Sequence, residues 1–318
     1  KFFNKEGQKF SLELEKRIEN KITEDMIPVE SIKLGKATRM NDARGRYIEF
    51  CKSSFTDLDL SGLSILLDCA NGATYSVAPS VFKELGAKVD TVGSTPDGIN
   101  INKNCGSTSP NLLKEEMING NYDLGIAFDG DGDRILIVDS DGTVLDGDDI
   151  LYILSKEISD KSGVVGTLMT NKALELYFEE SDINFVRADV GDKYVLDRLL
   201  TNNWQLGGEP SGHIICLDSS PTGDAIIAAL KFLKAISKND YSINSSLKGF
   251  KKFPQTLINL KVENPNKIIL SDLFWSRVTK IEKTLGPTGR VLIRPSGTEP
   301  LIRIMVESNN ASDSENFC

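Results

Sequence analysis

Histidine is almost absent from this sequence: His213 is the only one among 318 residues. A triad of serine, histidine and aspartate would have to use it, and a metal site built from several histidines is excluded. Taken alone, His213 is expected to be a structural histidine rather than a catalyst. Chemistry in this chain is therefore expected to depend on carboxylates, arginines and backbone amides.

Basic residues are also in the minority. The chain has 37 lysines and arginines against 46 aspartates and glutamates, which gives a formal net charge of −9 and a pI near 4.9. This balance argues against general binding of DNA or RNA, because neutralising a phosphate backbone requires a basic surface. We expect no nucleic-acid partner, although a small anion can still bind in a local basic pocket.

Paired cysteines and long apolar runs are missing as well. The five cysteines are widely spaced and form no C-x-x-C pair, which indicates reduced thiols. No apolar run approaches the roughly 20 residues of a membrane-spanning helix, and the opening residues lack the cleavage site of a secretory signal. These features predict a cytoplasmic protein that does not bind a membrane.

The sequence does contain a regular alternation of short apolar runs and amphipathic segments. Residues 63–70 and 87–93, for example, read as strands with a helical segment between them. This alternation predicts α/β units with parallel or mixed sheets. After about residue 245 the pattern changes to strands around a turn with one helix, which predicts a smaller α+β domain. Residues 50–147 and 148–247 are candidates for a structural repeat, although their sequences do not visibly align.

Three aspartates alternate with glycines in FDGDGDR (128–134), directly after an apolar strand. Asp129, Asp131 and Asp133 would repel one another unless a cation lay among them, and the glycines allow the curvature that brings them together. Such hard oxygen ligands suit Mg²⁺. An EF-hand is excluded because Arg134 stands where that loop requires glycine. Arg134 is instead a candidate for orienting the site or contacting an anion, and the alternative for the whole segment is an acidic, solvated turn.

Two later segments carry groups suited to a phosphorylated sugar. In GGEPSGH (207–213), Glu209 and Ser211 can hydrogen-bond vicinal sugar hydroxyls, although an ordinary glycine-rich turn explains this segment as well. The segment RPSGTEP (294–300) has the composition of a phosphate-binding nest, with a polar hairpin turn as the alternative. No G-x-x-x-x-G-K-[ST] motif occurs, so a P-loop nucleotide site is excluded. The candidate phosphate ligands are Arg294, Ser296, Gly297 and Thr298.

A fourth motif competes with these three. Residues 135–146 contain D-x-D-G-T after an apolar strand, which is typical of haloacid-dehalogenase phosphatases. Asp139 would then be the nucleophile and Asp141 the acid and base. The Asp-Gly pair also reads as a hairpin turn between two apolar runs, and the phosphatase interpretation leaves the other three motifs unexplained.

In this order, DGDGDR, GGExSGH and RPSGTEP resemble the motifs of the α-D-phosphohexomutase superfamily. Within it, the closest likeness is to the bacterial phosphoglucosamine mutases. Supporting stretches are LDCANGA (67–73), NINKNCGSTSP (100–110) and VGDKYV (190–195), and the resemblance covers nearly the whole chain.

The resemblance implies four domains around a central cleft, each of which gives one loop. The fold class is then a succession of mixed-sheet α/β domains of the phosphohexomutase type with a smaller α+β C-terminal domain. We expect a remnant of the first α/β domain with a linker helix at 1–47, a second domain with the metal loop at 48–147, a third with the sugar-specificity loop at 148–247, and the phosphate-binding domain at 248–318.

The activity that the resemblance implies is the interconversion of glucosamine 6-phosphate and glucosamine 1-phosphate, for the synthesis of UDP-N-acetylglucosamine and peptidoglycan precursors. It runs through a phosphoserine enzyme and a hexosamine 1,6-bisphosphate. Mg²⁺ would be held by the three aspartates, the sugar by Glu209 and Ser211, and the non-reacting phosphate by the residues around Arg294. Phosphoglucomutase and phosphomannomutase activities are the alternatives, and a homodimer is left open.

The sequence departs from the family pattern at the phosphoserine loop. That loop has the form Ser-His-Asn-Pro and would lie upstream of KFFNKEG, and no Ser-His pair occurs in this chain. We therefore expect a chain truncated at both ends, without its own nucleophile and inactive alone. Pro210 is a smaller departure, since the family more often holds a polar or flexible residue there.

Overall fold

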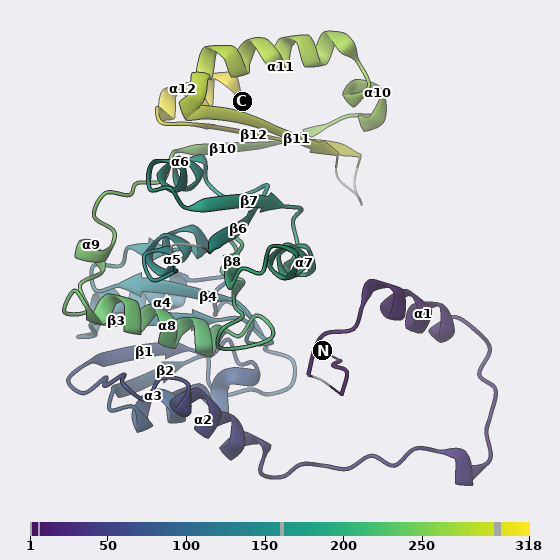
Figure 1. The fold of residues 1–318 in the computed structure, drawn as a ribbon, viewed down its shortest axis with the longest axis vertical. Helices are drawn as coiled ribbons and strands as arrows, with labels where there is room; N and C mark the ends of the chain where they lie inside the picture. Colours follow the sequence, from purple (N-terminus) through teal and green to yellow (C-terminus); the bar gives the residue numbers. More distant parts are fainter. Residues whose placement is uncertain (1, 6, 160–161, 296–299) are drawn as a thin grey trace. The chain divides into compact units, whose positions relative to one another are not determined.

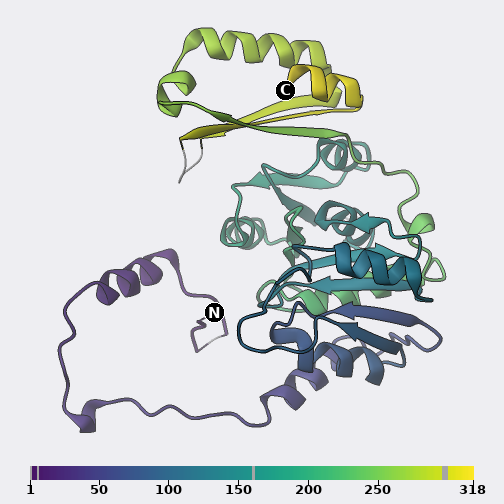
Figure 2. The ribbon, with the colours of Figure 1, turned by 180° about the vertical axis from the view of Figure 1, so that it is seen from behind.

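The structure is a computed structural model that describes residues 2–5, 7–159, 162–295 and 300–318. The chain divides into two compact units. The first consists of Lys1–Asp146 with Ser211–Lys234, and the second of Gly147–Pro210 with Ala235–Cys318. Figures 1 and 2 show the ribbon from opposite sides.

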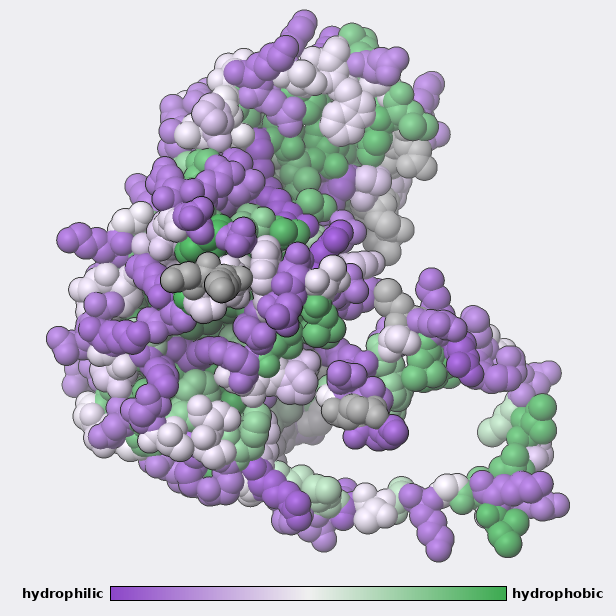
Figure 3. All heavy atoms as spheres, viewed as in Figure 1, coloured by the Kyte–Doolittle hydropathy of each residue, from purple (hydrophilic) through white to green (hydrophobic). Residues whose placement is uncertain are grey.

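The first unit opens with a stretch that buries little. No described side chain in residues 2–41 is buried, although this stretch includes helix α1 (Leu12–Ile22) and the short 3₁₀ helix η1 (Ser31–Lys33). Apolar side chains are exposed along it (Figure 3). Met26 is 92% exposed and Ile32 is 90% exposed. Burial of apolar surface therefore contributes little to holding this stretch.

The core of the first unit is a mixed five-stranded sheet in the order β2-β1-β3-β4-β5. Strand β1 is parallel to β2 and β3, whereas β4 is antiparallel to both β3 and β5. The central strands are continuous apolar runs, as expected for strands covered on both faces. The strands are β1 (Ser64–Asp68), β2 (Lys88–Val92), β3 (Leu124–Phe128), β4 (Ile135–Asp139) and β5 (Val144–Leu145).

Helices cover this sheet. Leu113 and Met117 of α4 pack into one core cluster with Leu66 of β1 and Ala127 of β3. The other elements of the first unit are α2 (Ala43–Ser53), η2 (Ala73–Ser76), α3 (Ala78–Glu84), α4 (Asn111–Asn119) and β9 (Ile214–Cys216), and α8 (Ala225–Ser237) begins there.

The second unit contains a parallel sheet with the strand order β7-β6-β8. This order repeats that of β2-β1-β3 in the first unit, where the strands are also parallel. Every residue of helix α5 is buried. The elements are α5 (Gly147–Ser155), β6 (Gly163–Thr167), α6 (Lys172–Glu180), β7 (Asn184–Ala188), α7 (Asp192–Asn202), β8 (Leu206–Gly208) and α9 (Ile243–Ser246).

The second unit ends in an antiparallel sheet, β10-β12-β11, with helices on one face (Figures 1 and 2). A hydrogen-bond contact of 3.1 Å between Thr256 Oγ1 and Ser314 Oγ identifies the face that α12 covers. The elements are β10 (Gln255–Lys261), α10 (Pro265–Ile269), α11 (Asp272–Leu285), η3 (Gly286–Thr288), β11 (Gly289–Pro295), β12 (Leu301–Ser308) and α12 (Ala311–Phe317).

This architecture confirms the predicted succession of mixed α/β sheets followed by a smaller α+β domain. None of the helices in the described residues is long and apolar enough to cross a bilayer. The predicted limits at 47, 147 and 247 stay predictions.

Candidate functional site

The aspartate loop, residues 129–134, begins where β3 ends. Asp129 is fully buried. Its Oδ1 accepts hydrogen bonds from the amides of Gly132, Asp133 and Arg134 at 3.1, 3.0 and 3.0 Å. Its Oδ2 accepts a hydrogen bond of 2.8 Å from Nε of Arg134. One carboxylate therefore folds the loop around itself through charge-assisted hydrogen bonds.

The structure brings the three predicted aspartates together. One carboxylate oxygen each of Asp129, Asp131 and Asp133 lies within 4.8 Å of the others. Oxygens in an octahedral Mg²⁺ shell lie about 3 Å apart when adjacent and about 4.2 Å apart when opposite, so a small inward movement would complete one side of such a shell. Asp131 is exposed, which leaves the other side open to water or phosphate. The donor set therefore fits a divalent cation with hard oxygen ligands.

The segment after β1 holds the aspartate loop in place. The carbonyl of Gly130 accepts a hydrogen bond of 2.8 Å from the amide of Ala73. A Cβ at Gly72 would lie 2.3 Å from that carbonyl oxygen, and a Cβ at Gly130 would lie 2.7 Å from Nδ2 of Asn102. Glycine is required at Gly72 because only it lets the two backbones approach this closely, whereas the neighbours of Gly130 are side-chain atoms of Asn102 and Ile101.

The 211–213 segment pairs with the end of the aspartate loop inside the first unit. The amide of Ile135 donates a hydrogen bond of 3.0 Å to the carbonyl of Gly212, and Arg134 and His213 form an antiparallel bridge. Gly212 has φ +89, and a Cβ there would lie 1.9 Å from the carbonyl oxygen of Ile135. Part of the second sequence motif thus reaches the first through direct backbone pairing.

His213 is buried beside the loop, with 5% of the residue exposed. Its Nδ1 lies 3.6 Å from Oδ2 of Asp133. On the other side of the ring, a Cβ at Gly223 would lie 2.1 Å from Nε2. This tight packing favours the structural role expected for His213.

The first turn of α8 also contacts the aspartate loop. The amide of Ala225 donates a hydrogen bond of 3.0 Å to the carbonyl of Gly132. Asp224, just before the helix, accepts hydrogen bonds from two amides of this turn at 3.0 and 3.1 Å and from the hydroxyl of Tyr47 at 2.8 Å. Burial and the charge of Asp224 raise the pKa of Tyr47, so the hydroxyl remains a donor. Sequence reasoning gave no role to Asp224 or Tyr47, because the contact between them joins segments far apart in the sequence.

Glu209 lies in the second unit, directly after β8, and is half-buried. Its Oε1 accepts a hydrogen bond of 2.9 Å from the amide of Gly191, which has φ +131 and immediately precedes α7. The carboxylate thus lies at a helix N-terminus, where the helix dipole favours negative charge. Ser211 is exposed and belongs to the first unit. Sequence reasoning noted the segment VGDKYV without recognising Gly191 as the partner of Glu209.

Arg294 lies near the end of β11 and is half-buried. The other predicted phosphate ligands, Ser296, Gly297 and Thr298, lie outside the described residues. Arg303 of β12 stands directly opposite Arg294 in the antiparallel register. Within the described part of the chain, Nε of Arg303 is buried and has no hydrogen-bond partner. Two guanidinium groups placed opposite each other repel, so this pair suits an anion.

Arg303 is a candidate ligand that sequence reasoning missed. The signal that could have found it is the pairing of the two strands around RPSGTEP, which places Arg303 opposite Arg294. The length of the connecting turn decides that register, and a shift of one residue would move Arg303 to the other face of the sheet.

The alternative phosphatase pair lies in a hairpin turn between β4 and β5. The amide of Asp139 donates a hydrogen bond of 2.8 Å to the carbonyl of Thr143, and the amide of Gly142 donates one of 2.9 Å back to Asp139. The side chain of Asp141 accepts a hydrogen bond of 2.8 Å from the amide of Thr143. The Asp-Gly pair therefore forms the turn predicted from it, and hairpin geometry accounts for both aspartates.

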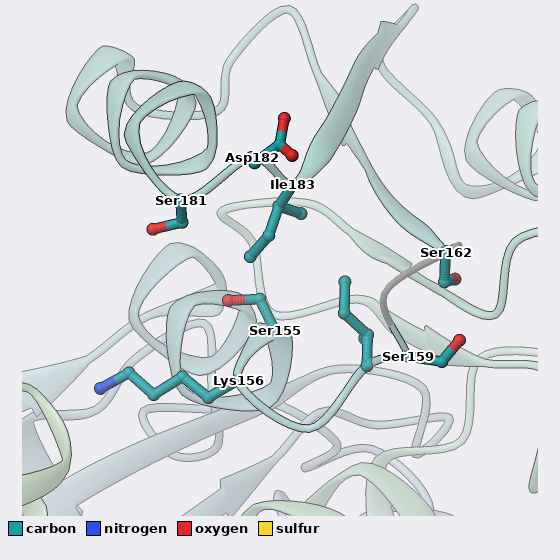
Figure 4. A pocket seen from close by; sticks show the side chains of 8 residues that line it. Ser155, Lys156, Ser159, Ser162, Ser181, Asp182 and Ile183 are labelled. Carbon is teal, nitrogen blue, oxygen red and sulfur yellow. The ribbon is translucent and has the colours of Figure 1, made fainter.

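A separate polar hollow in the second unit involves none of the predicted site residues (Figure 4). It lies where α5 and α6 end and where β6 and β7 begin, between Ser155, Ser162 and Asp182. Ligands of parallel sheets bind beyond the carboxyl ends of the strands, which is the end where Glu209 follows β8. Lys156, which also lines the hollow, donates a hydrogen bond of 2.6 Å to the carbonyl of Ser246.

Comparison with known proteins decides between the families. Family models of phosphoglucomutase/phosphomannomutase match residues 45–142 (α/β/α domain II), 146–253 (α/β/α domain III) and 257–317 (C-terminal domain). A phosphoglucosamine mutase of Legionella pneumophila (strain Corby) is 50% identical over 317 residues, covering 98% of this chain and 70% of the relative. That of Acinetobacter baumannii (strain AYE) is 49% identical over 315 residues, covering 98% and 71%. The chain belongs to the phosphoglucosamine mutase family.

Solved structures show the same fold in more distant members of the phosphohexomutase superfamily. The Aspergillus fumigatus N-acetylphosphoglucosamine mutase, in complex with GlcNAc-6P and magnesium, has a TM-score of 0.69 at 20% identity, covering 85% of this chain and 68% of that one. A phosphoglucomutase/phosphomannomutase family protein of Burkholderia thailandensis has a TM-score of 0.72 at 22% identity, covering 86% and 62%. These likenesses confirm the predicted phosphohexomutase fold.

Membership of the phosphoglucosamine mutase family confirms the resemblance drawn from the three motifs. It identifies the chain with an isomerase that moves a phosphoryl group on a hexosamine, and it does not favour the haloacid-dehalogenase alternative.

Proposed function

We propose that this chain provides the metal, sugar and phosphate sites for interconverting glucosamine 6-phosphate and glucosamine 1-phosphate. The observation that carries the proposal is the convergence of Asp129, Asp131 and Asp133 within 4.8 Å at the carboxyl end of β3. Identity of 50% to a phosphoglucosamine mutase supports the choice of substrate. A glucose 1,6-bisphosphate complex is known for a mutant of the Aspergillus fumigatus enzyme, which supports a hexosamine 1,6-bisphosphate as intermediate here.

Mg²⁺ is the proposed cofactor, held by the three aspartates. When bound, it would neutralise charge on a phosphoryl group in transfer. The chain's own contribution is the closed geometry of the loop: Asp129 is tied to three amides and to Arg134, so its carboxylate is oriented before any cation arrives. We propose that Arg134 orients this carboxylate and presents its remaining donors to the substrate phosphate.

Recognition of the sugar and recognition of the phosphate are proposed for different residues. Glu209, held by the amide of Gly191, would accept hydrogen bonds from sugar hydroxyls or the amino group, and Ser211 would exchange hydrogen bonds with a hydroxyl. Arg294 and Arg303 would bind the phosphate that is not reacting, because two opposed guanidinium groups match its charge and geometry. Ser296, Gly297 and Thr298 are proposed to complete this phosphate site.

Binding is the property of this chain to test, since these 318 residues contain no Ser-His pair to carry the phosphoryl group. Inactivity of the chain alone, a cytoplasmic location and a homodimer stay predictions. Calorimetric titration with Mg²⁺ present should give tighter binding of glucosamine 6-phosphate than of glucose 6-phosphate or mannose 6-phosphate.

Two variants separate the recognition of sugar and phosphate. Glu209→Ala should remove the preference for the amino sugar, and Arg294→Ala should weaken binding of all three hexose phosphates by about tenfold or more, the usual cost of a lost charge-assisted hydrogen bond. Arg277→Ala, on the exposed side of α11, is the matched control and should leave binding unchanged. A preference for glucose or mannose phosphate would contradict the proposal in favour of the related mutases.

A further inference from the structure

The C-terminal sheet carries ordered rows of side chains on the face that its own helices leave open. Side chains alternate between the faces of a strand, and residues opposite each other in antiparallel strands share a face. Thr256 and its partner Val306 belong to the face that α12 covers, so their neighbours along each strand belong to the open face. Three cross-strand pairs of β11 and β12 follow one another there: Arg290 with Glu307, Leu292 with Met305, and Arg294 with Arg303.

The first of these pairs binds a single loop of the preceding α/β domain, residues 167–172, called the docking loop here. Arg290 donates hydrogen bonds to the carbonyls of Leu168 and Thr170 at 2.9 and 2.7 Å. Glu307 is fully buried and accepts a hydrogen bond of 3.0 Å from the amide of Lys172, the first residue of α6. The C-terminal sheet thus binds the carbonyls of this short loop through a positively charged side chain and its amide through a negatively charged one.

The docking loop also binds the connection between the two domains. Asn171 donates a hydrogen bond of 3.0 Å from Nδ2 to the carbonyl of Phe253 and accepts one of 3.0 Å at Oδ1 from the amide of Phe253. Phe253 lies two residues before β10. The amide of Asn171 donates in turn to Asp148 at 2.8 Å, so the loop is anchored in its own domain.

Charge is balanced separately on each side of this contact. Arg187 of the α/β domain donates hydrogen bonds of 2.8 and 2.7 Å to the carbonyls of Thr167 and Thr170, and it is paired with Glu175 of the same domain. Arg290 is paired with Glu307 of its own sheet. Buried ion pairs stabilise little by themselves, but they demand a defined geometry because every donor needs its acceptor. This contact is therefore suited to setting an orientation.

We infer that Arg290 and Glu307 are positioning residues for the phosphate site. Arg294 follows Arg290 by four residues on the same strand face, about 13 Å along a strand, and Arg303 has the same relation to Glu307. Fixing one end of this two-stranded segment on the docking loop fixes the other end, which carries the two phosphate-binding arginines. The inference rests on the proposed function, since it concerns how that phosphate site is held.

The test compares Arg290→Gln and Glu307→Gln with Arg277→Gln, an exposed arginine of α11 in the same domain. Affinities for glucosamine 6-phosphate and for Mg²⁺ are measured by calorimetry, and hydrogen exchange is followed at residues 167–172 and 250–256. Both docking variants should bind the sugar phosphate about tenfold more weakly, the scale of one lost charge-assisted hydrogen bond. Their Mg²⁺ affinity should stay within about twofold, because the aspartates lie in the other unit.

Arg290→Lys keeps the positive charge at this position, so it is a conservative control in case Arg290→Gln fails to fold. A lysine ammonium group is a point charge that cannot span two carbonyls as the guanidinium does. The affinity of Arg290→Lys for glucosamine 6-phosphate should therefore fall between those of the wild type and Arg290→Gln. Circular dichroism should show all variants folded, and exchange at 167–172 should rise only in the docking variants.

Unchanged sugar-phosphate affinity in Arg290→Gln and Glu307→Gln, with faster exchange at the docking loop, would overturn the positioning role and leave only a stabilising contact. Wild-type exchange at 167–172 as fast as in the docking variants would also overturn it. Failure of the wild-type chain to bind any hexose phosphate would instead contradict the proposed function, and the positioning role would fall with it. The exchange data would then still show whether the docking exists.

Discussion

At the scale of single residues, the three aspartates of the loop do different work although the sequence presents them alike. Asp129 is buried and takes hydrogen bonds from three amides and from Arg134, whereas Asp131 is exposed. The glycine-aspartate alternation was enough to predict that carboxylates gather here. It could not show which one folds the loop, because that depends on the path of the chain after β3.

This difference makes Asp129→Asn and Asp131→Asn a matched pair. Asp131→Asn should weaken Mg²⁺ binding and leave the unfolding free energy nearly unchanged. Asp129→Asn should weaken Mg²⁺ binding and also destabilise the first unit by roughly 1–3 kcal/mol, because an amide cannot satisfy the same set of donors. Calorimetric Mg²⁺ titration and urea unfolding measure the two effects. Equal stability losses in both variants would contradict the roles assigned to the two carboxylates.

At the scale of elements, the site depends on contacts between segments far apart in the sequence. The positions of strands such as β1 and β2 and the Asp-Gly hairpin were predictable, because apolar runs and turn residues are local signals. The contact of α8 with the aspartate loop was not predictable, since it requires Ala225 to meet Gly132. The opposition of Arg294 and Arg303 was hidden for the same reason: strand register is set by the whole hairpin.

The start of α8 gives a prediction at this scale. Asp224→Ala removes the carboxylate that caps α8 and binds Tyr47, so the turn that holds the carbonyl of Gly132 should loosen. Mg²⁺ affinity should fall by about tenfold, the lower end of the effects of residues that support metal ligands. Asp218→Ala, a surface carboxylate paired with Lys231 further along α8, is the control and should have no effect. Equal Mg²⁺ affinities in the two variants would contradict the supporting role of Asp224.

Helix α6 and strand β7 give a pH prediction. Burial opposes ionisation of Glu175, but hydrogen bonds and charge from Arg187, with help from Lys172, outweigh it and lower the pKa of Glu175. A carboxyl whose folded-state pKa is lowered stabilises the fold above its ordinary pKa of about 4.3, and this contribution is lost as pH falls through the lowered value.

Urea unfolding at pH 7 and near pH 3 tests this contribution. The wild type should lose more stability than Glu175→Gln between these values, and at pH 7 the variant should be the less stable of the two. Glu180→Gln, an exposed carboxyl at the end of the same helix, should follow the wild type. Parallel pH profiles for the wild type and Glu175→Gln would contradict the assignment.

At the scale of the whole molecule, the order of motifs along the chain was sufficient to predict the family and the succession of sheets. The division of the chain into two units could not be predicted in this way. Residues 211–234 join the first unit although they follow the strands of the second, because Gly212 pairs with Ile135 and Ala225 with Gly132. Hydrophobic periodicity does not show which unit a segment such as 211–234 joins, since it reports only which residues are buried.

The central claim is that these sites serve a mutase rather than a phosphatase or a simple sugar-phosphate binder. The most direct test is calorimetric titration with glucosamine 1,6-bisphosphate, with and without Mg²⁺. An enzyme that turns a bisphosphate over between two half-reactions should bind it at least about tenfold more tightly than either monophosphate, and removal of Mg²⁺ should abolish that advantage. Bisphosphate binding no tighter than that of the monophosphates, or release of inorganic phosphate that Asp139→Asn prevents, would contradict the account.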